Sequence, residues 1–389
     1  MAFTHFVPTK ILFGQGQIKK LHEQRLPGKK ALIVISCGKS TRKYGYLDTV
    51  VNELEQAGLS FAVFDQIQPN PTKVNVMDGA ACAKKSDCDF VIGLGGGSCL
   101  DASKAIAIMA TNSGDYWDYI HGGTGKGMPV TKAPLPIVAI TTTAGTGTEA
   151  DPWAVVTNEM TNEKIGFGME STFPVLSIVD PEMMTTVPPA FTAYQGFDAL
   201  FHSMEGYISK NANALSDVYA LAAIENVTAN LAQAVKNGSD VNAREKVALG
   251  NTLSGFVESI CGVTSQHSLE HALSAAQPNL PHGAGLIMIS RAFFTHFAQA
   301  GVCDTRMIAM AKAMGRNNAT KAMDFVEALM ELQEACGVAG LKMSDYGLRK
   351  EDLAQYAKDA RETMGKLFAC DPVALSDEDT TAIFEASFR

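Results

Sequence analysis

Between residues 30 and 180 the chain alternates short runs of apolar and β-branched residues with longer amphipathic segments. Each run is typical of a buried strand, because it is nearly continuous in apolar residues and too short for a buried helix. The segments 44–57 and 73–86 carry apolar residues at helical spacing. This order predicts a mainly parallel sheet with helices on both faces, which binds ligands at the carboxyl ends of its strands. The expected strands are 30–36, 60–65, 89–97, 135–143 and 176–180.

The pattern changes near the proline pair Pro188–Pro189. Beyond it, stretches rich in alanine, leucine and methionine repeat their apolar residues at helical spacing. A chain of 389 residues is also long enough for about two domains. We therefore expect an α/β dinucleotide-binding domain over residues 1–188 and an all-α metal-binding and substrate domain over 189–389. The clearest helical stretches of the second are 214–235, 241–261 and 319–336.

Composition narrows the choice of partner and compartment. The chain has 32 lysines and arginines against 41 acidic residues, and the net charge of −9 argues against a nucleic acid or an anionic membrane as the main partner. No stretch approaches the roughly 18 apolar residues of a membrane span, and the N-terminus lacks the pattern of a secretory signal. Eight scattered cysteines without a C-x-x-C pair are typical of reduced thiols, so we expect a cytoplasmic protein.

A glycine-rich segment, "VIGLGGGSCLDASK", predicts a phosphate-binding loop. Gly95, Gly96 and Gly97 connect an apolar strand to a helix, where main-chain N–H groups can converge on an anion and a Cβ would be in the way. Ser98 and Asp101 have the S-x-x-D spacing of a capping box at the start of that helix. A tight strand-to-helix turn without a ligand is the plainer interpretation, and these glycines follow the third expected strand, whereas the usual dinucleotide motif follows the first.

A second loop, "TTTAGTGTEAD" at residues 141–151, follows the next expected strand. It offers hydroxyl groups and flexible main chain at what should be the same edge of the sheet. Thr142, Thr143 and Thr146 are its candidate ligands for a cofactor. Two such loops together favour a nucleotide over a simple turn.

The second half of the chain gathers candidate metal ligands. Asp198 and His202 are four residues apart and share one face of a helix, and His267 and His271 repeat that spacing. His282 follows in a P-H-G turn that leads into another helix. Three imidazole nitrogens and a carboxylate suit a divalent first-row transition metal. The segment His267–His271 also has the H-x-x-E-H pattern of a peptidase, with Glu270 as acid or base, but a peptidase leaves both glycine and threonine loops unexplained.

Together these motifs resemble the iron-dependent (group III) alcohol dehydrogenases, including their NAD(P)H-dependent butanol dehydrogenase and aldehyde reductase members. The similarity extends over essentially the whole chain. The segments that carry it are "ILFGQGQIKKL", "QPNPT", "GLGGGSCLDASK", "TTTAGTGTEAD", "SIVDPEMMTTVPP", "GFDALFHSMEGYIS", "LPHGAG" and "CDPVALSDEDTTAIFEASF".

The resemblance implies an N-terminal nucleotide-binding domain, a helical domain and an active site in the cleft between them. It places the metal ligands at Asp198, His202, His267 and His282, with His271 beside them as a group that could move the alcohol proton. The implied metal is Fe²⁺, with Zn²⁺ or another divalent ion as alternatives, and it polarises the oxygen of a small primary alcohol or aldehyde while a nicotinamide carries the hydride. The chain would act as a homodimer or higher homo-oligomer.

The choice between NAD and NADP depends on the turn after the first expected strand. An NAD enzyme usually offers a carboxylate there to the ribose 2′-hydroxyl. Residues 31–47 contain no acid, and the turn resembles that of the NADP-using members, so we expect NADP to be preferred; a solvated run of charges is the plainer interpretation. The basic and polar residues of the turn are Gly38, Lys39, Ser40, Arg42 and Lys43. The candidate cofactor-binding set is Gly38, Ser40, Asn70, Gly95, Gly96, Gly97, Ser98, Asp101, Thr142, Thr143, Thr146 and Lys164.

Other functions remain open on sequence alone. Dehydroquinate synthases and glycerol-type polyol dehydrogenases resemble the same fold and also bind nucleotide and metal, but the synthase should need a basic cluster for its substrate, and none stands beside the candidate ligands. A non-catalytic nucleotide-binding protein is a third class. It predicts decayed ligand positions, whereas all four are intact here.

Overall fold

The computed structural model describes residues 2–389, which form two compact units. The first unit is Phe6–Thr186 and the second is Val187–Arg389, which residues 2–5 join. The first carries every strand that the structure assigns, and the second is helical. The α/β and all-α characters expected from the sequence are confirmed.

Six parallel strands form the sheet of the first unit. The five predicted strands are all present, with ends shifted by at most two residues. The short strand β1 was not predicted, because its four residues are only half-buried at the sheet edge and carry a lysine. In spatial order the strands are β1 (Lys10–Phe13), β8 (Leu176–Val179), β5 (Ile137–Thr141), β4 (Phe90–Gly95), β2 (Lys30–Ser36) and β3 (Ser60–Ile67).

A separate antiparallel hairpin, β6 (Ala154–Asn158) with β7 (Glu163–Phe167), also belongs to this unit. The sequence did not predict it, because Asn158, Glu159 and Asn162 interrupt the apolar run. The hairpin packs through β6 against a helix that follows the glycine loop.

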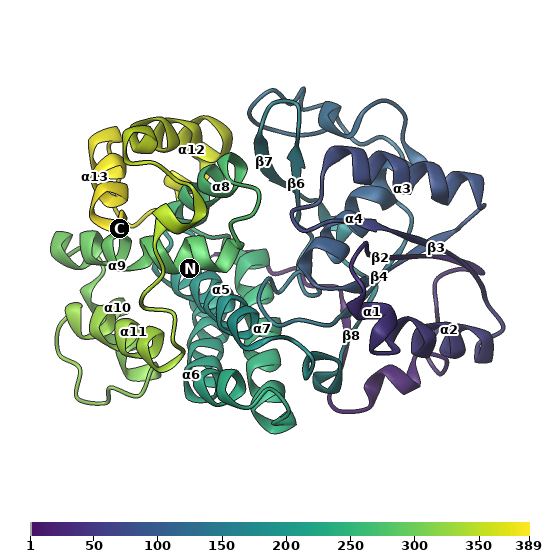
Figure 1. Ribbon diagram of the computed structural model, residues 1–389, viewed down its shortest axis with the longest axis horizontal. Helices are drawn as coiled ribbons and strands as arrows, with labels where there is room; N and C mark the ends of the chain where they lie inside the picture. Colours follow the sequence, from purple (N-terminus) through teal and green to yellow (C-terminus); the bar gives the residue numbers. More distant parts are fainter. Residues whose placement is uncertain (1) are drawn as a thin grey trace. The chain divides into compact units, whose positions relative to one another are not determined.

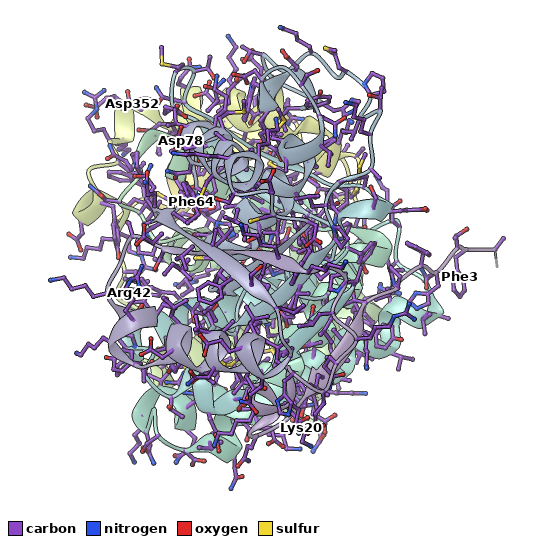
Figure 2. The ribbon with its side chains drawn as sticks, turned by 90° about the vertical axis from the view of Figure 1, so that its right-hand side faces the viewer. Phe3, Lys20, Arg42, Phe64, Asp78 and Asp352 are labelled. Carbon is purple, nitrogen blue, oxygen red and sulfur yellow. The ribbon has the colours of Figure 1, made fainter. Side chains whose placement is uncertain are left out.

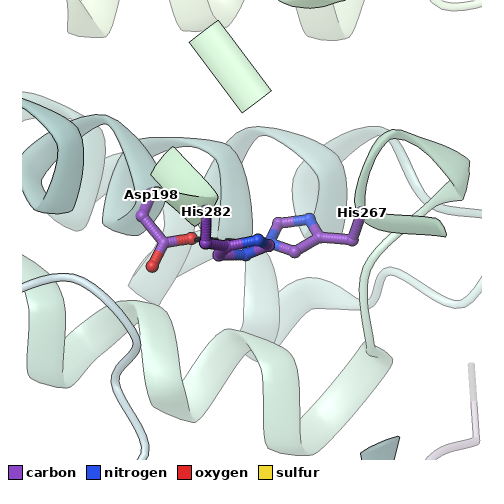
Figure 3. A group of neighbouring side chains, drawn as sticks. All are labelled: Asp198, His267 and His282. Carbon is purple, nitrogen blue, oxygen red and sulfur yellow. Dashed lines mark ion pairs between the residues drawn. The ribbon is translucent and has the colours of Figure 1, made fainter. Parts of the chain in front are cut away.

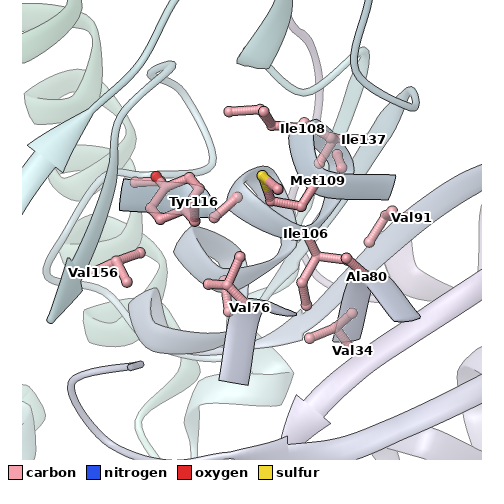
Figure 4. Packing of buried hydrophobic residues seen from close by; sticks show 14 of the residues in the cluster. Val34, Val76, Ala80, Val91, Ile106, Ile108, Met109, Tyr116, Ile137 and Val156 are labelled. Carbon is pink, nitrogen blue, oxygen red and sulfur yellow. The ribbon is translucent and has the colours of Figure 1, made fainter. Parts of the chain in front are cut away.

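Helices cover both faces of the sheet. In Figure 1, α3 (Lys73–Lys85) and α4 (Gly97–Thr111) lie on one face and α2 (Tyr46–Gln56) lies on the other. Alternate side chains of β2 therefore pack on opposite faces. Leu32 and Val34 pack with α3 and α4, whereas Ile33 and Ile35 pack with α2. Figure 4 shows the first of these cores. Strands buried on both faces explain the continuous apolar runs in the sequence.

The strand order creates a point where the chain reverses direction across the sheet. From β2 the chain passes to β3 on one side, and then returns past β2 to β4, β5 and β8 on the other side. Doubly wound sheets bind ligands at such a switch point, beyond the carboxyl ends of the strands. The glycine loop follows β4, which is one of the two strands at this point, so its place after the third predicted strand is consistent with a nucleotide site.

The remaining elements of the first unit are short. They are α1 (Ser40–Lys43) and the 3-10 helices η1 (Gln17–Lys20), η2 (Tyr116–Asp118), η3 (Glu170–Thr172) and η4 (Pro181–Met184).

The second unit is built around a long, largely buried helix, α5 (Pro189–Ile208), which packs against α6 and α7. Two predicted helices have nearly the expected bounds, and the third begins four residues later than predicted. Within residues 2–389, the structure contains no helix both long and apolar enough to span a bilayer. The other elements are α6 (Ala214–Lys236), α7 (Val241–Cys261), α8 (Ser265–Ala276), α9 (His282–Ala300), α10 (Asp304–Ala313), α11 (Met323–Ala335), η5 (Met343–Tyr346), η6 (Lys350–Asp352), α12 (Leu353–Phe368) and α13 (Asp377–Ser387).

Candidate metal centre and cofactor-binding edge

Three helices of the second unit bring the predicted metal ligands together. Asp198 lies in the middle of α5, His267 in the first turn of α8, and His282 is the first residue of α9. One donor atom from each of the three lies within 4.8 Å of the others (Figure 3). Residues far apart in sequence therefore converge on one point.

Two of the atoms at this point are buried without ordinary hydrogen bonds among the described residues. Asp198 Oδ1 lies 3.4 Å from His282 Nε2 and 3.6 Å from His267 Nε2. Within residues 2–389, Asp198 Oδ1 and His267 Nε2 have no partner that satisfies ordinary hydrogen-bond geometry. Burying polar atoms in this way lowers the free energy of unfolding unless another group or an ion pairs with them. One carboxylate oxygen and two imidazole nitrogens fit a divalent transition-metal ion between them.

Glu205 fixes the orientation of His267. His267 Nδ1 donates to Glu205 Oε1 over 2.5 Å, and Glu205 also accepts hydrogen bonds from the main-chain N–H and the hydroxyl of Thr264, at 3.0 and 2.9 Å. A carboxylate on Nδ1 directs Nε2 toward a metal and raises its basicity. Sequence analysis missed Glu205, although it follows Asp198 by seven residues and His202 by three, and so lies on the same face of the helix.

Glu270 has the same role for His282. It is fully buried, and His282 Nδ1 donates a short hydrogen bond to its Oε2. The glutamate of the H-x-x-E-H segment therefore orients a candidate ligand, which is not the exposed position that the acid or base of a peptidase needs. The peptidase interpretation is not supported by this geometry.

The electrostatics of the cluster are complementary. Burial opposes the charged form of Asp198, but the neighbouring His202 and His282 outweigh it and lower the pKa of the carboxyl. Burial likewise opposes a charged His267, but Glu205 and Asp198 raise its pKa to about 10. A metal ion held by His267 would take the place of a proton on that imidazole, so its binding would be coupled to proton release.

The other two histidines lie beside the group of three. His202 Nδ1 is 3.7 Å from Asp198 Oδ1, its Nε2 is 3.6 Å from Glu258 Oε2, and its ring centre is 4.4 Å from that of His267. His271 is buried, with Nδ1 at 2.8 Å from the sulfur of Met364 and its ring centre 5.3 Å from that of His282. Both are placed next to the centre that the first three residues form.

In the first unit, the two predicted loops pack against each other at the carboxyl edge of the sheet. Gly95 has a φ of +155°, which favours glycine. A Cβ on Gly97 would lie 2.5 Å from Thr146 Cγ2, and one on Gly96 would lie 3.0 Å from the side chain of Thr143. Glycine is needed here so that the threonine loop can approach the start of α4.

The predicted capping box at Ser98 and Asp101 is wrong. Helix α4 begins at Gly97, with Gly96 as its N-cap and no side-chain cap. Asp101 instead accepts hydrogen bonds from the hydroxyl of Thr148 at 2.7 Å and from the main-chain N–H of Val155 at 3.0 Å. Burial raises the pKa of Asp101 to about 6, against the opposing effect of Lys104. The Asp101 carboxylate therefore bonds to residues distant in the sequence and does not cap α4.

Two further contacts hold the threonine loop. Lys104 is fully buried, and its Nζ donates to Thr148 Oγ1 at 2.6 Å and to Asp151 Oδ1 at 3.0 Å. The main-chain N–H of Thr142 donates to the carbonyl oxygen of Gly95 over 2.9 Å. Thr142, Thr143 and Thr146 stay partly exposed at this edge.

The other cofactor candidates are distributed along the unit. Gly38 and Ser40 are exposed just beyond β2, and Asn70 follows β3 with a φ of +53°. These three belong to the same carboxyl edge as the glycine loop. Lys164 is buried in β7, within the separate hairpin.

Comparisons with known proteins agree with the geometry. The model of the iron-containing alcohol dehydrogenases matches residues 8–181, and that of the C-terminal region of the same family matches residues 192–388. The chain is 34% identical to a 1,3-propanediol dehydrogenase of Klebsiella pneumoniae, with 99% of each chain covered. It is 31% identical to an NAD-dependent methanol dehydrogenase of Bacillus methanolicus, covering 92% and 93% of the two chains.

The chain belongs to the iron-containing alcohol dehydrogenase family. A solved alcohol dehydrogenase of a halo-thermophilic archaeon from a Red Sea brine pool superimposes with a TM-score of 0.94 at 34% identity, covering 100% and 99% of the chains. This iron-containing alcohol dehydrogenase is thus an NAD(P)-dependent oxidoreductase of alcohols and aldehydes. The lyase and polyol alternatives are not favoured.

Proposed function

We propose that this enzyme interconverts small primary alcohols and aldehydes at a divalent metal, with Fe²⁺ as the expected ion, held by Asp198, His202, His267 and His282. The observation that carries the proposal is the convergence of Asp198 Oδ1 and His267 Nε2, both buried and without ordinary hydrogen bonds within residues 2–389. His202 is the fourth ligand by its place beside Asp198 and His267.

When bound, the metal supplies Lewis-acid polarisation of the substrate oxygen, and the nicotinamide supplies or accepts the hydride. The protein residues prepare this chemistry. Glu205 and Glu270 keep protons on the Nδ1 atoms of His267 and His282, so that the Nε2 atoms of both face the centre. His271, whose ring lies next to that of His282, is the proposed group that accepts the alcohol proton.

We propose that the dinucleotide binds at the edge formed by the glycine and threonine loops, with NADP preferred over NAD. The support for NADP is the basic turn that follows β2, where Lys39, Arg42 and Lys43 line one pocket. Relatives include an NAD-dependent methanol dehydrogenase and a probable NADH-dependent butanol dehydrogenase of Bacillus subtilis, so the preference needs a direct test.

We also propose a cytoplasmic homodimer or higher homo-oligomer. The eight cysteines are all free thiols, which suits a reducing compartment. Strand β1 lies at the edge of its sheet, and an edge strand can pair with the same strand of a second copy.

The test is the oxidation of NADPH, and separately of NADH, after butyraldehyde is added to protein stripped of metal and reloaded with iron, zinc or nothing. We expect oxidation only with metal, faster with NADPH, and lost in His267→Ala. Oxidation that is unchanged without metal would contradict the proposed centre. Equal catalytic efficiency with both cofactors would contradict the NADP preference alone.

A further inference from the structure

A pocket lies at the carboxyl end of β2 and carries an acid that the local sequence does not contain. It has a volume of about 430 Å³ and is lined by the turn Ser36–Lys39 with Arg42, Lys43 and Asp65. Asp65 comes from β3, more than twenty residues away in the chain. Residues 36–43 alone offer three cations, Lys39, Arg42 and Lys43, whereas the folded pocket holds these three cations and one carboxylate.

Asp65 makes a direct ion pair in this pocket. Arg42 donates to Asp65 Oδ2 over 2.7 Å, and the two side chains are 53% and 48% exposed. Figure 2 shows Arg42 at the surface of the first unit. Both groups are thus accessible to a ligand, and each is engaged by the other before any ligand arrives.

The strand order places this pocket at one end of the dinucleotide site. Strand β2 pairs with β3 on one side and with β4 on the other, and β4 leads into the glycine loop. The turn after β2 is therefore one strand away from the loop that suits the pyrophosphate, and neighbouring strands lie roughly 5 Å apart. The adenosine ribose of a dinucleotide lies on this side of the pyrophosphate in a doubly wound sheet.

We propose that Asp65 is a specificity-determining residue that limits the preference of this enzyme for NADPH over NADH. A 2′-phosphate binds Arg42 most tightly when the guanidinium has no other partner. Here the phosphate must compete with the carboxylate of Asp65 for the guanidinium, and the two negative charges also repel each other. A 2′-hydroxyl can instead donate a hydrogen bond to Asp65. The Arg42–Asp65 pair thus weakens the binding of NADPH and favours the binding of NADH. This inference rests on the proposed dinucleotide site.

The experiment measures binding without turnover. NADPH and NADH are titrated by their fluorescence, and adenosine 2′,5′-bisphosphate and AMP by calorimetry, against the wild-type protein, Asp65→Asn, Arg42→Gln and the double variant. We expect Asp65→Asn to raise the ratio of NADPH to NADH affinity about three- to tenfold, as suits an exposed pair, and Arg42→Gln to lower it. In the double variant the effect of Asp65→Asn should shrink, because the arginine it releases is absent.

Asp352→Asn is the matched control, because Asp352 is a carboxylate paired with an exposed arginine, Arg349, at 2.7 Å in the helical unit. A ratio that stays within twofold of wild type in Asp65→Asn, or changes equally in Asp352→Asn, would overturn the proposal while leaving the dinucleotide site in place. Failure of the wild-type protein to bind any of the four nucleotides would overturn the site and the inference together.

Discussion

The two candidate sites are built from different parts of the chain. At the edge of the sheet, the candidate site consists mainly of glycines and main-chain groups, and threonine side chains occupy the space that a Cβ on those glycines would fill. In the helical unit, single side-chain atoms of Asp198, His267 and His282 form the candidate centre, and two buried glutamates orient the two histidines. A site made of main chain is sensitive to added atoms, whereas a site made of side chains is sensitive to lost ones.

The sites also differ in burial, and this affects the size of the expected effects. The carboxylates of the candidate metal centre are almost completely buried, so a charge that loses its partner there is strongly destabilised. The ion pair at the sheet edge is half-exposed, where solvent screens the interaction. Changes in the helical unit should therefore have the larger consequences.

Asp198→Ala should have the largest effect of the variants, because it removes a buried carboxylate from the candidate metal centre. It removes the only carboxylate of the group of three and should abolish metal binding, because imidazoles alone leave the centre without its negative charge. We expect turnover to fall roughly 10³-fold or more, in keeping with several kcal/mol of lost electrostatic stabilisation. Metal content by mass spectrometry and the rate of NADPH oxidation check this.

Ser203→Ala is the control for that variant, because Ser203 is buried in the same helix and its hydroxyl bonds only to the carbonyl of Ala199 among the contacts given by the structure. It should keep its metal. Full metal occupancy in Asp198→Ala would show that the ion is held elsewhere.

Glu205→Gln should have the next largest effect. The amide keeps the shape of the side chain but removes its negative charge and replaces one of the two oxygens that accept hydrogen bonds from His267 Nδ1 and from Thr264. Loss of such an orienting carboxylate costs about 10- to 100-fold in metal affinity. Competition with a chelator measures this affinity, and cofactor binding should be unchanged. An unaltered metal affinity would mean that helix packing alone orients His267.

Gly97→Ala tests the main-chain site. The new Cβ would meet Thr146 Cγ2 at 2.5 Å, so the threonine loop has to move away from the start of α4. We expect dinucleotide affinity to fall about tenfold, equivalent to about 1.4 kcal/mol, while metal content stays normal. Fluorescence titration with NADPH gives the affinity.

Adding Thr146→Ser to that variant removes the methyl group that the new Cβ meets, and should restore much of the affinity. Gly340→Ala is the control, because nothing lies within 4 Å of a Cβ at that position. Equal losses in both glycine variants would point to general destabilisation.

The length and burial of an element decide whether the sequence could predict it. Periodicity located five of the strands of the sheet and the helices α6 and α7, because those elements are long or continuously buried. It missed β1, which is short and half-buried, and the hairpin of β6 and β7, whose polar residues interrupt the apolar run. Helical spacing also grouped Asp198 with His202, and the same rule applied to Glu205 would have identified the carboxylate that orients His267.

Contacts across long sequence distances could not be predicted. The capping box was wrong because Asp101 finds partners about fifty residues away, in the threonine loop and in β6. The turn after β2 contains no acid, yet β3 supplies Asp65 to it. Both depend on which strands become neighbours, and that is a property of the whole sheet.

Asp371→Asn concerns the stability of the fold, not metal or cofactor binding. Asp371 is fully buried, and its Oδ1 accepts a hydrogen bond from the main-chain N–H of Ser265, at the start of the helix that carries His267. Burial raises the pKa of Asp371 from 3.8 to about 7. The native state therefore holds a proton between about pH 4 and pH 7 that the unfolded chain releases, so the contribution of this group to stability falls as the pH rises through that interval.

An asparagine keeps the acceptor for Ser265 and stays neutral, so the variant should gain stability relative to the wild type as the pH rises from 4 to 7. The gain should reach about 2–4 kcal/mol, since each unit of pKa shift corresponds to about 1.4 kcal/mol. Denaturant unfolding of both proteins across this range gives the difference, which cancels the titration of all other groups. A difference that does not change with pH would mean that Asp371 is already ionised in the native state and acts as a charged cap of the helix.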